Sequence, residues 1–554
     1  MRTPSVRGLG LALTLPLSLT VQAADVLACG GFFCASQPVI QTGEQIIFGV
    51  DPDTQSVDAI INIAYQGAAP DFAWVLPLTA APRSIRAGSS AAFRALAIST
   101  TPRFQPRLRT EGSCSVGLFG VGGDAGAGLD AGAPSGGVAV LSQESVGPYD
   151  SVVLASRDPT ATRGWLNDNG YRVTDEMMQV VVPYLATDHV LLALKLRKEQ
   201  TVGDLQPIQL ELDANEPCIP LRLTAIAAQA DMDVVAYVLG PRRAIPRNYF
   251  HVIPNWARID WLRSGANYRS IVAEAADEAG GNAFVTEFSG ATSSLGTLLD
   301  TQGDIRIRRE LEGTADLGAF ISAVTNNGLF QRPETLGILR RWIPDALLES
   351  AGLDPALFWQ APPFYAEQLR ETSFDPLPPA REIDERIFAP DLAAQALFSE
   401  FPHLTRLYTL ISPEEMNVDP MFDFRDLPDV SNVHSADVLV SCEDGRPTRA
   451  EVTLDDGQRY ALSASLQPLA STPAAAKIED LARALVISDR SDDIAVVLDG
   501  TFVERRGELP DPRGTSCGCR TGATPDTRAA SDTAGRTLAL ALLLGLLISR
   551  RRRG

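Results

Sequence analysis

Hydrophobic and polar residues alternate along the first half of the chain as they do in β-strands. In VDAIINIAY, every second residue from Val57 to Tyr65 is apolar, so a strand there has one apolar face. The apolar run DFAWVLPL follows at residues 71–78. Three later stretches also have the character of strands: VLLALKLR (190–197), IQLELD (208–213) and MDVVAYVLG (232–240). These patterns predict a large β-rich domain over residues 24–300.

The period of the apolar residues changes to that of a helix after about residue 300. From Leu317 to Val324 they recur at intervals of three and four, which places them on one helical face. Residues 301–435 are therefore predicted to be mainly helical. Strand patterns return in DVLVSC, AEVTLD and RYALSA, so residues 436–510 are predicted to form a small α+β segment. The predicted fold class is α+β, with a large β-rich N-terminal domain, a helical middle region and this small C-terminal segment.

A glycine-rich stretch, GVGGDAGAGLDAGAPSGG, interrupts the β-rich domain at residues 120–137. It has no large apolar side chains that could pack against a core. It is predicted to be a mobile surface loop.

The N-terminus has the features of a secretory signal peptide. Arg2 and Arg7 are followed by an apolar run that ends at Val21, and this run is too short to span a bilayer comfortably. Small residues predict cleavage between Ala23 and Ala24, so that residues 1–23 are removed. The alternative is that VLAC acts as a lipidation signal and Cys29 carries a lipid.

The C-terminus carries a second short apolar run, residues 537–549, between Arg536 and four consecutive arginines. A helix of this length reaches only about 20 Å, which is short for a permanent membrane span. The Arg-rich tail, residues 550–554, favours a cytoplasmic end. Upstream, residues 511–536 form a polar linker that contains Cys517, Gly518 and Cys519.

This combination of a cysteine motif, a short apolar helix and an arginine cluster resembles the MYXO-CTERM sorting tails of myxobacterial surface proteins. The resemblance covers about residues 515–554. It implies that an intramembrane sorting protease removes the tail and that the protein is attached to the outer cell surface near the cysteines. The alternative is a lasting C-terminal membrane anchor.

The seven cysteines would enter a compartment where disulfides persist if the chain is exported. Cys29 and Cys34 lie in CGGFFC, where two glycines allow a tight loop, so a local disulfide is predicted. Cys114 and Cys218 are predicted to pair because both lie in the N-terminal half. Sequence alone does not determine the connectivity, and the partner of Cys442 is left open.

The charge of the chain argues against a nucleic-acid partner. Removing residues 1–23 and 520–554 takes away nine of the 48 basic and two of the 68 acidic residues, which leaves a net charge near −27. Such a surface repels phosphate backbones.

No catalytic, cofactor or metal motif is found. The four histidines form no H-E-x-x-H pattern, and G-x-S-x-G and G-x-x-x-x-G-K are absent. Asp419, Asp423 and Asp426 lack the spacing of a calcium loop, and a solvated loop is the preferred interpretation. Two carboxylates that flank a sugar remain an open alternative, because such pairs are spatial rather than sequential.

A series of short phrases resembles a bacterial family known as domain of unknown function 2330. The phrases are ACGGFFC, PDFAWVLPL, LQPIQLEL, IPLRLTAIAA, PRNYFHV, GNAFVTEFSG and LPDVSNVH. Their order covers about residues 28–435, strongly to residue 290 and more loosely afterwards. The resemblance implies an exported protein and transfers no activity or functional residue.

These observations predict an exported protein at the outer cell surface or outer membrane, held there by its tail or by a lipid. Its predicted role is non-catalytic, either binding an unidentified surface ligand or envelope protein or supporting the envelope itself. The alternative is a surface hydrolase that uses paired carboxylates. A pocket that joins two or more acids with raised pKa values would favour hydrolysis, and a flat apolar patch without such acids would favour binding.

Overall fold

The computed structural model describes most of the chain between residues 40 and 489. The described ranges are 40–66, 73–112, 139–187, 189–197, 205–214, 216–294, 299, 301–444, 446–455, 457–462 and 472–489. Several predicted features lie outside them: the signal peptide with Ala23 and Ala24, the glycine-rich loop, the linker, the apolar helix 537–549, the Arg-rich tail, and Cys29, Cys34, Cys114, Cys517 and Cys519. Within these ranges no helix has the length and apolar character that a membrane crossing requires.

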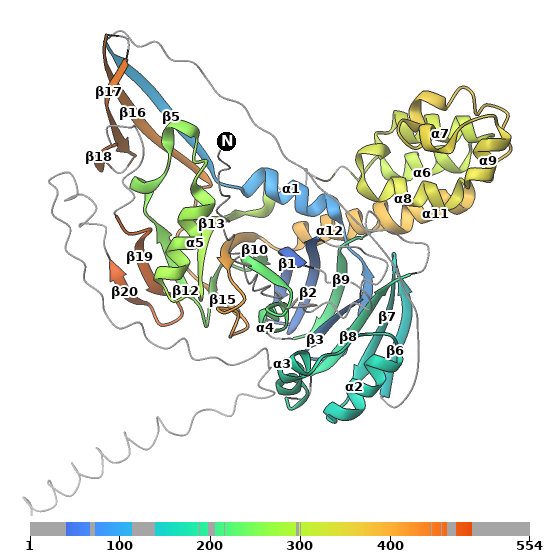
Figure 1. The fold of residues 1–554 in the computed structure, drawn as a ribbon, viewed down its shortest axis with the longest axis horizontal. Helices are drawn as coiled ribbons and strands as arrows, with labels where there is room; N and C mark the ends of the chain where they lie inside the picture. Colours follow the sequence, from blue (N-terminus) through green and yellow to red (C-terminus); the bar gives the residue numbers. More distant parts are fainter. Residues whose placement is uncertain are drawn as a thin grey trace, which may run out of the picture.

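A ten-stranded mixed sheet forms the centre of the molecule (Figure 1). Its strand order is β20-β19-β12-β13-β14-β10-β1-β2-β9-β4. The strands are β1 (Ile40–Asp51), β2 (Ser56–Gln66), β4 (Ser84–Ala87), β9 (Ile208–Asp213), β10 (Ala228–Gly240), β12 (Phe250–Pro254), β13 (Ala283–Ala291), β14 (His403–Ile411), β19 (Ala475–Asp480) and β20 (Leu485–Asp489). In the middle of the sheet, β1 is parallel to β10 and antiparallel to β2, and β10 is antiparallel to β14. The predicted β-rich N-terminal region is confirmed.

Hydrophobic cores cover both faces of the central sheet. Neighbouring side chains on a strand point to opposite faces, so each strand contributes to both cores. Ile46 belongs to the core shared with a second sheet, and Ile47 belongs to the core on the other face with Ile60 and Tyr237. The second sheet has the order β3-β8-β7-β6. Its strands and helices are β3 (Ala73–Leu78), β6 (Ala139–Val146), β7 (Tyr149–Ala155), β8 (Val190–Leu196), α2 (Pro159–Asp168) and α3 (Asp175–Leu185).

A third sheet, of order β18-β17-β16-β5, brings distant parts of the chain together. Its strands are β5 (Arg103–Glu111), β16 (Val433–Glu443), β17 (Arg446–Leu454) and β18 (Arg459–Ala461), and β5 is parallel to β16. A short β11 (Arg243–Pro246) pairs with β15 (Phe422–Arg425). Strands from the predicted C-terminal segment therefore complete sheets that begin with N-terminal strands.

The predicted helical region is confirmed for residues 304–400 and forms its own lobe (Figure 1). Its helices are α6 (Asp304–Glu312), α7 (Leu317–Asn326), α8 (Pro333–Trp342), α9 (Asp345–Ser350), α10 (Pro355–Phe358), α11 (Leu377–Ile383), the π-helix η7 (Asp384–Phe388) and α12 (Ala389–Glu400). Leu317, Phe320, Ile321 and Val324 are all buried in the core of this lobe. The prediction that helix continues to residue 435 needs correction, because β14 and β15 follow, and β14 lies between β13 and β10 in the central sheet.

Three further helices pack near the central sheet: α1 (Ser90–Thr100), α4 (Leu221–Thr224) and α5 (Tyr268–Glu278). Ser89 caps α1 through a 3.0 Å hydrogen bond from the Ala92 amide to its hydroxyl oxygen, which satisfies one of the free N–H groups at the helix start.

Cys218 and Cys442 each take part in a disulfide. On the parallel pair β5 and β16, Glu111 lies opposite Ser441, so the chain leaves β5 beside Cys442. Figure 1 shows this end of β5 at the tip of the third sheet, far from α4, which directly follows the Cys218 segment. Cys114 lies outside the described residues, so its predicted pairing with Cys218 stays untested, and from the register of β5 and β16 we expect Cys442 to be its partner.

Peptide mapping under non-reducing conditions is expected to yield a Cys114–Cys442 cross-linked peptide that disappears after reduction. The physical reason is that Glu111, three residues before Cys114 in the chain, lies opposite Ser441, the residue before Cys442. Recovery of a Cys114–Cys218 peptide would instead support the pairing predicted from position in the sequence.

Candidate functional site

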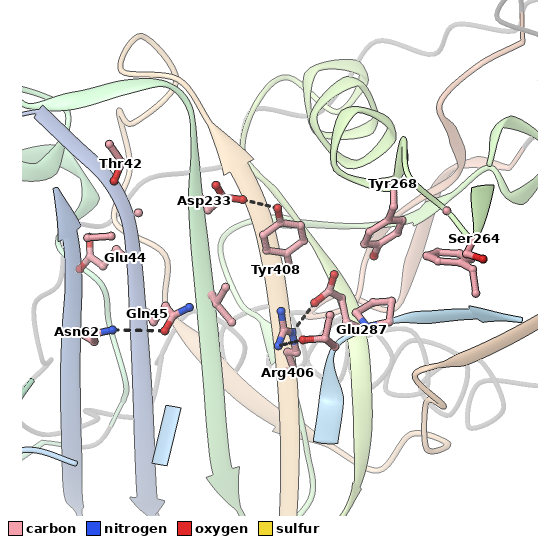
Figure 2. Close-up of a pocket in the computed structure, with 17 residues that line it drawn as sticks. Thr42, Glu44, Gln45, Asn62, Asp233, Ser264, Tyr268, Glu287, Arg406 and Tyr408 are labelled. Carbon is pink, nitrogen blue, oxygen red and sulfur yellow. Dashed lines mark hydrogen bonds and ion pairs between the residues drawn. The ribbon is translucent and has the colours of Figure 1, made fainter. Parts of the chain in front are cut away.

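A pocket of about 490 Å³ opens on the face of the central sheet that α5 covers (Figure 2). Four neighbouring strands, β2, β1, β10 and β14, provide its floor, and Glu287 on β13 lies beside them. Its other walls come from α5 and from the segments around Thr101 and Ser264. The side chains that line it include Gln45, Asn62, Phe104, Asp233, Tyr268, Glu287, Arg406 and Tyr408.

The strand register places a row of side chains across the floor of this pocket. Gln45 lies opposite Asn62 on one side and Val235 on the other, and Val235 lies opposite Tyr408. Residues directly opposite one another on paired strands point to the same face. The Asn62 Nδ2 and Gln45 Oε1 atoms are 3.5 Å apart, and both side chains remain partly exposed. Two amides and a tyrosine therefore share one row in the floor.

A buried ion pair between Glu287 and Arg406 forms the inner end of the pocket. Arg406 Nε lies 2.5 Å from Glu287 Oε2, and the two side chains are 9% and 1% exposed. Arg406 Nη1 also donates to Tyr237 Oη at 2.8 Å and to Thr101 Oγ1 at 3.0 Å. Burial raises the pKa of Glu287, and the charge of Arg406 opposes that rise. The pair is therefore held in place from several sides.

Glu287 lies at a β-bulge in β13, which directs its side chain toward Arg406. Thr286 lies opposite Leu407 and Phe288 lies opposite Arg406, so Glu287 is the extra residue between them. An extra residue of this kind re-aims a side chain, and bulges are common beside functional sites.

Asp233 and Tyr408 lie at the outer end of the pocket. The Tyr408 hydroxyl donates to Asp233 Oδ1, and Arg269 Nη2 lies 3.1 Å from Asp233 Oδ2. Burial, together with the nearby Asp233 carboxylate, raises the pKa of Tyr408 well above its usual value, so the phenol stays protonated. Figure 2 shows Tyr408 between Asp233 and the Glu287–Arg406 pair. Asp233 thus has both an arginine and a tyrosine as partners.

Glu44 is the second carboxyl group near the pocket with a raised pKa. Its Oε2 accepts hydrogen bonds from Gln41 Nε2 at 3.1 Å and from Thr224 Oγ1 at 3.3 Å. Thr224 belongs to α4, which packs on the opposite face of the sheet with the core that contains Ile46. Burial raises the pKa of Glu44 to about 7.

Glu44 and Glu287 do not flank a common point in the pocket. Their strands are separated by β10 and β14, which corresponds to about 14 Å at the usual strand spacing. The two carboxyl groups of glycosidases lie only about 5–9.5 Å apart. The pocket therefore contains two acids with raised pKa values without the geometry that hydrolysis requires of this pair.

The residues considered from sequence lie elsewhere. The interpretation of Asp419 as part of a solvated loop is wrong, because its side chain is fully buried. It accepts hydrogen bonds from the Tyr184 hydroxyl at 2.7 Å and from the Arg222 amide at 2.9 Å. His251 is buried between Glu479 and Thr286. The described residues contain no group of three or more His, Cys, Asp or Glu side chains that could hold a metal ion. None of these residues lines the pocket.

Sequence reasoning missed the pocket residues. The only local signal is a polar residue inside an apolar strand pattern, as with Asn62 in VDAIINIAY and Arg406 in LTRLYTL. Such a residue is expensive to bury without a partner. The signal indicates that a partner exists but does not identify it.

The N-terminal half of the chain matches a known family model. Residues 23–297 match DUF2330, described as an uncharacterized protein conserved in bacteria. This region is therefore similar to the DUF2330 family over just under half of the chain. The match includes Gln45, Asn62, Asp233 and Glu287 and ends before the helical lobe, so it supports the family resemblance up to residue 297. No curated protein and no solved structure matches the chain.

Proposed function

We propose that this protein is an exported binding protein whose pocket accepts a neutral, polyhydroxylated ligand such as a sugar unit. The observation that carries the proposal is the row of Asn62, Gln45 and Tyr408 in the pocket floor. Each amide offers both a donor and an acceptor, which is what a hydroxyl group needs.

The charges of the pocket favour a neutral ligand. Glu287 is paired with Arg406, and Asp233 is paired with Arg269 and Tyr408. An ionic ligand would have to compete with these pairs. The aromatic rings of Phe104 and Tyr268, whose centroids are 5.3 Å apart, form an apolar wall beside the polar floor. An apolar wall with a few polar groups is the usual composition of a small-molecule site.

Replacement of Gln45 and Asn62 with alanine tests this proposal. A screen of the protein against neutral oligosaccharides, followed by calorimetry, is expected to identify a ligand. Each substitution is expected to weaken its binding about 2- to 10-fold, because one or two neutral hydrogen bonds are lost. Gln368→Ala, at an exposed position in the helical lobe, is the matched control and should bind normally. Failure to bind any neutral glycan, or equal binding by all variants, would contradict the proposal.

The alternative function is hydrolysis, and one observation favours it. Glu287 has a raised pKa, stands on a bulge and faces the same pocket as Asp233, whose charge contributes to that rise. If the pocket hydrolyses its ligand, the calorimetric samples will contain cleaved product. Glu287→Gln would then abolish cleavage and retain binding, because it removes the proton donor and keeps the shape.

We also propose that the protein works at the outer cell surface. The signal-peptide pattern of residues 1–23, cleavage between Ala23 and Ala24, and the sorting pattern with Cys517, Gly518 and Cys519 support this location. A sorting protease and the membrane or an attached lipid would be its partners, together with a surface ligand or envelope protein. The same non-reducing peptide map, made from surface material, should begin at Ala24 and lack peptides from 537–549. Intact tail peptides there would show a lasting anchor.

A further inference from the structure

A second and larger pocket, of about 710 Å³, lies between the helical lobe and the two N-terminal sheets. One wall comes from β4, from the β6–β7 turn and from the end of β8. The other comes from α8, α11, η7 and α12. The pocket joins the DUF2330 region to a part of the chain beyond the family match.

Basic side chains outnumber acidic ones in this pocket, the reverse of the chain as a whole. The chain has 68 acidic and 48 basic residues. The pocket is lined by five arginines and three glutamates: Arg86, Arg197, Arg341, Arg381, Arg386, Glu144, Glu382 and Glu385. A local excess of positive charge in an acidic protein favours an anionic occupant.

One carboxylate serves two of these arginines. Glu382 Oε1 lies 3.2 Å from Arg386 Nη1 and 3.4 Å from Arg341 Nη1. Its other oxygen accepts a 2.7 Å hydrogen bond from Trp342 Nε1. Glu382 is only 10% exposed, so its capacity is used within the protein and it cannot turn to neutralise further guanidinium groups.

Arg197, which directly follows β8, lines the same pocket as Arg341 and Arg386. Burial and the positive charges of Arg341 and Arg386 lower the pKa of Arg197, although Asp150 and Glu382 oppose that effect. The Asp150 carboxylate also accepts a 2.8 Å hydrogen bond from the Ser145 hydroxyl. An anion between these guanidinium groups would relieve their mutual repulsion.

The backbone around Arg386 is unusual. Arg386 lies in the π-helix η7, a wide turn of a kind that is rare and frequent at functional sites. Its Nε atom donates to Gln206 Oε1 at 3.2 Å, and the Gln206 amide donates in turn to the Gly88 carbonyl at 3.2 Å. These contacts connect the wide turn to the sheet and fix the direction of the Arg386 guanidinium, which is 3% exposed.

We propose that this second pocket binds a small polyanion, a molecule with at least two phosphate or carboxylate groups. The excess of two positive charges among the lining residues suits such a ligand. The planar guanidinium groups of Arg197, Arg341 and Arg386 suit the paired oxygens of either group. The exposed Arg86 and Arg381 lie at positions where they can meet the ligand as it enters.

Calorimetric titration of the full-length protein with pyrophosphate and with citrate tests the proposal. At least one of them is expected to bind, and the stronger one identifies phosphate or carboxylate as the preferred group. Arg197→Gln and Arg381→Gln are each expected to weaken binding about tenfold, as the loss of a charge-assisted hydrogen bond requires. Two variants at separate places in the pocket guard against a folding defect in either one.

Arg109→Gln is the matched control, because it removes the same charge from an exposed side chain of β5. It should leave anion binding unchanged, and so should Asn62→Ala in the first pocket. The proposal is overturned if neither anion binds at millimolar concentration. It is equally overturned if Arg109→Gln weakens binding as much as Arg197→Gln, because the effect would then be general charge attraction.

Discussion

Replacement of Arg406 with methionine is expected to lower the free energy of unfolding by about 3–5 kcal/mol. The substitution leaves the Glu287 carboxyl group, which is 1% exposed, without its cation. It also removes the donor that reaches Tyr237 and Thr101. Breaking a buried pair costs far more than the pair contributes as a whole, because the remaining charge stays desolvated. Urea denaturation near neutral pH, followed by circular dichroism, measures the loss.

Two further variants show whether the remaining charge causes the loss. The double variant Glu287→Gln/Arg406→Met is expected to recover part of the stability, since no buried charge is left. Arg306→Met removes one partner of the exposed i,i+4 pair with Glu310 and should change stability by less than about 1 kcal/mol. A loss in Arg406→Met as small as that in Arg306→Met would contradict a buried, charged pair.

Replacement of Glu44 with glutamine is expected to flatten the dependence of stability on pH. The folded protein raises the pKa of Glu44 from 4.5 to about 7, so the native state holds a proton that the unfolded chain has lost in this range. The favourable contribution is complete below about pH 4.5 and is lost as the pH rises through about 7. The full loss corresponds to about 3 kcal/mol.

Glutamine keeps the shape of Glu44 and can still accept from Gln41 and Thr224, but it carries no charge. Glu44→Gln should therefore be more stable than the parent protein above about pH 8 and similar to it below about pH 4.5. Urea denaturation at several pH values measures the difference. Glu310→Gln, at an exposed position on α6, should change stability little at any of these pH values. Parallel stability curves for Glu44→Gln and the parent would show that folding does not raise the pKa of Glu44.

The DUF2330 region and the helical lobe meet at the arginine-lined pocket, while the neutral pocket lies mainly on the central sheet. Glu287, Arg406 and Tyr408 lie on strands that directly precede and follow the lobe. The two proposed sites have different lining residues, and one is proposed to take a neutral ligand and the other an anion, so substitutions in one pocket should leave binding at the other unchanged.

The amino-acid sequence by itself determined the local elements. The intervals from Leu317 to Val324 predicted a helix, and alternation from Val57 to Tyr65 predicted a strand, because each pattern depends only on which neighbours share a face. It did not determine where the helical region ends, since the apolar run in HLTRLYTLI is compatible with either element until β10 and β13 pair with it.

Only the tertiary structure decided which residues meet. Glu287 and Arg406 are 119 positions apart in the sequence, and the whole helical lobe lies between them. They meet because β13 pairs with β14. Gln45 and Tyr408 share a row because β10 lies between their strands. Arg197 and Arg386 line one pocket because α11, η7 and α12 lie beside β4 and the end of β8. Strand order and register depend on the packing of all the sheets at once. A local pattern of apolar residues does not determine that packing.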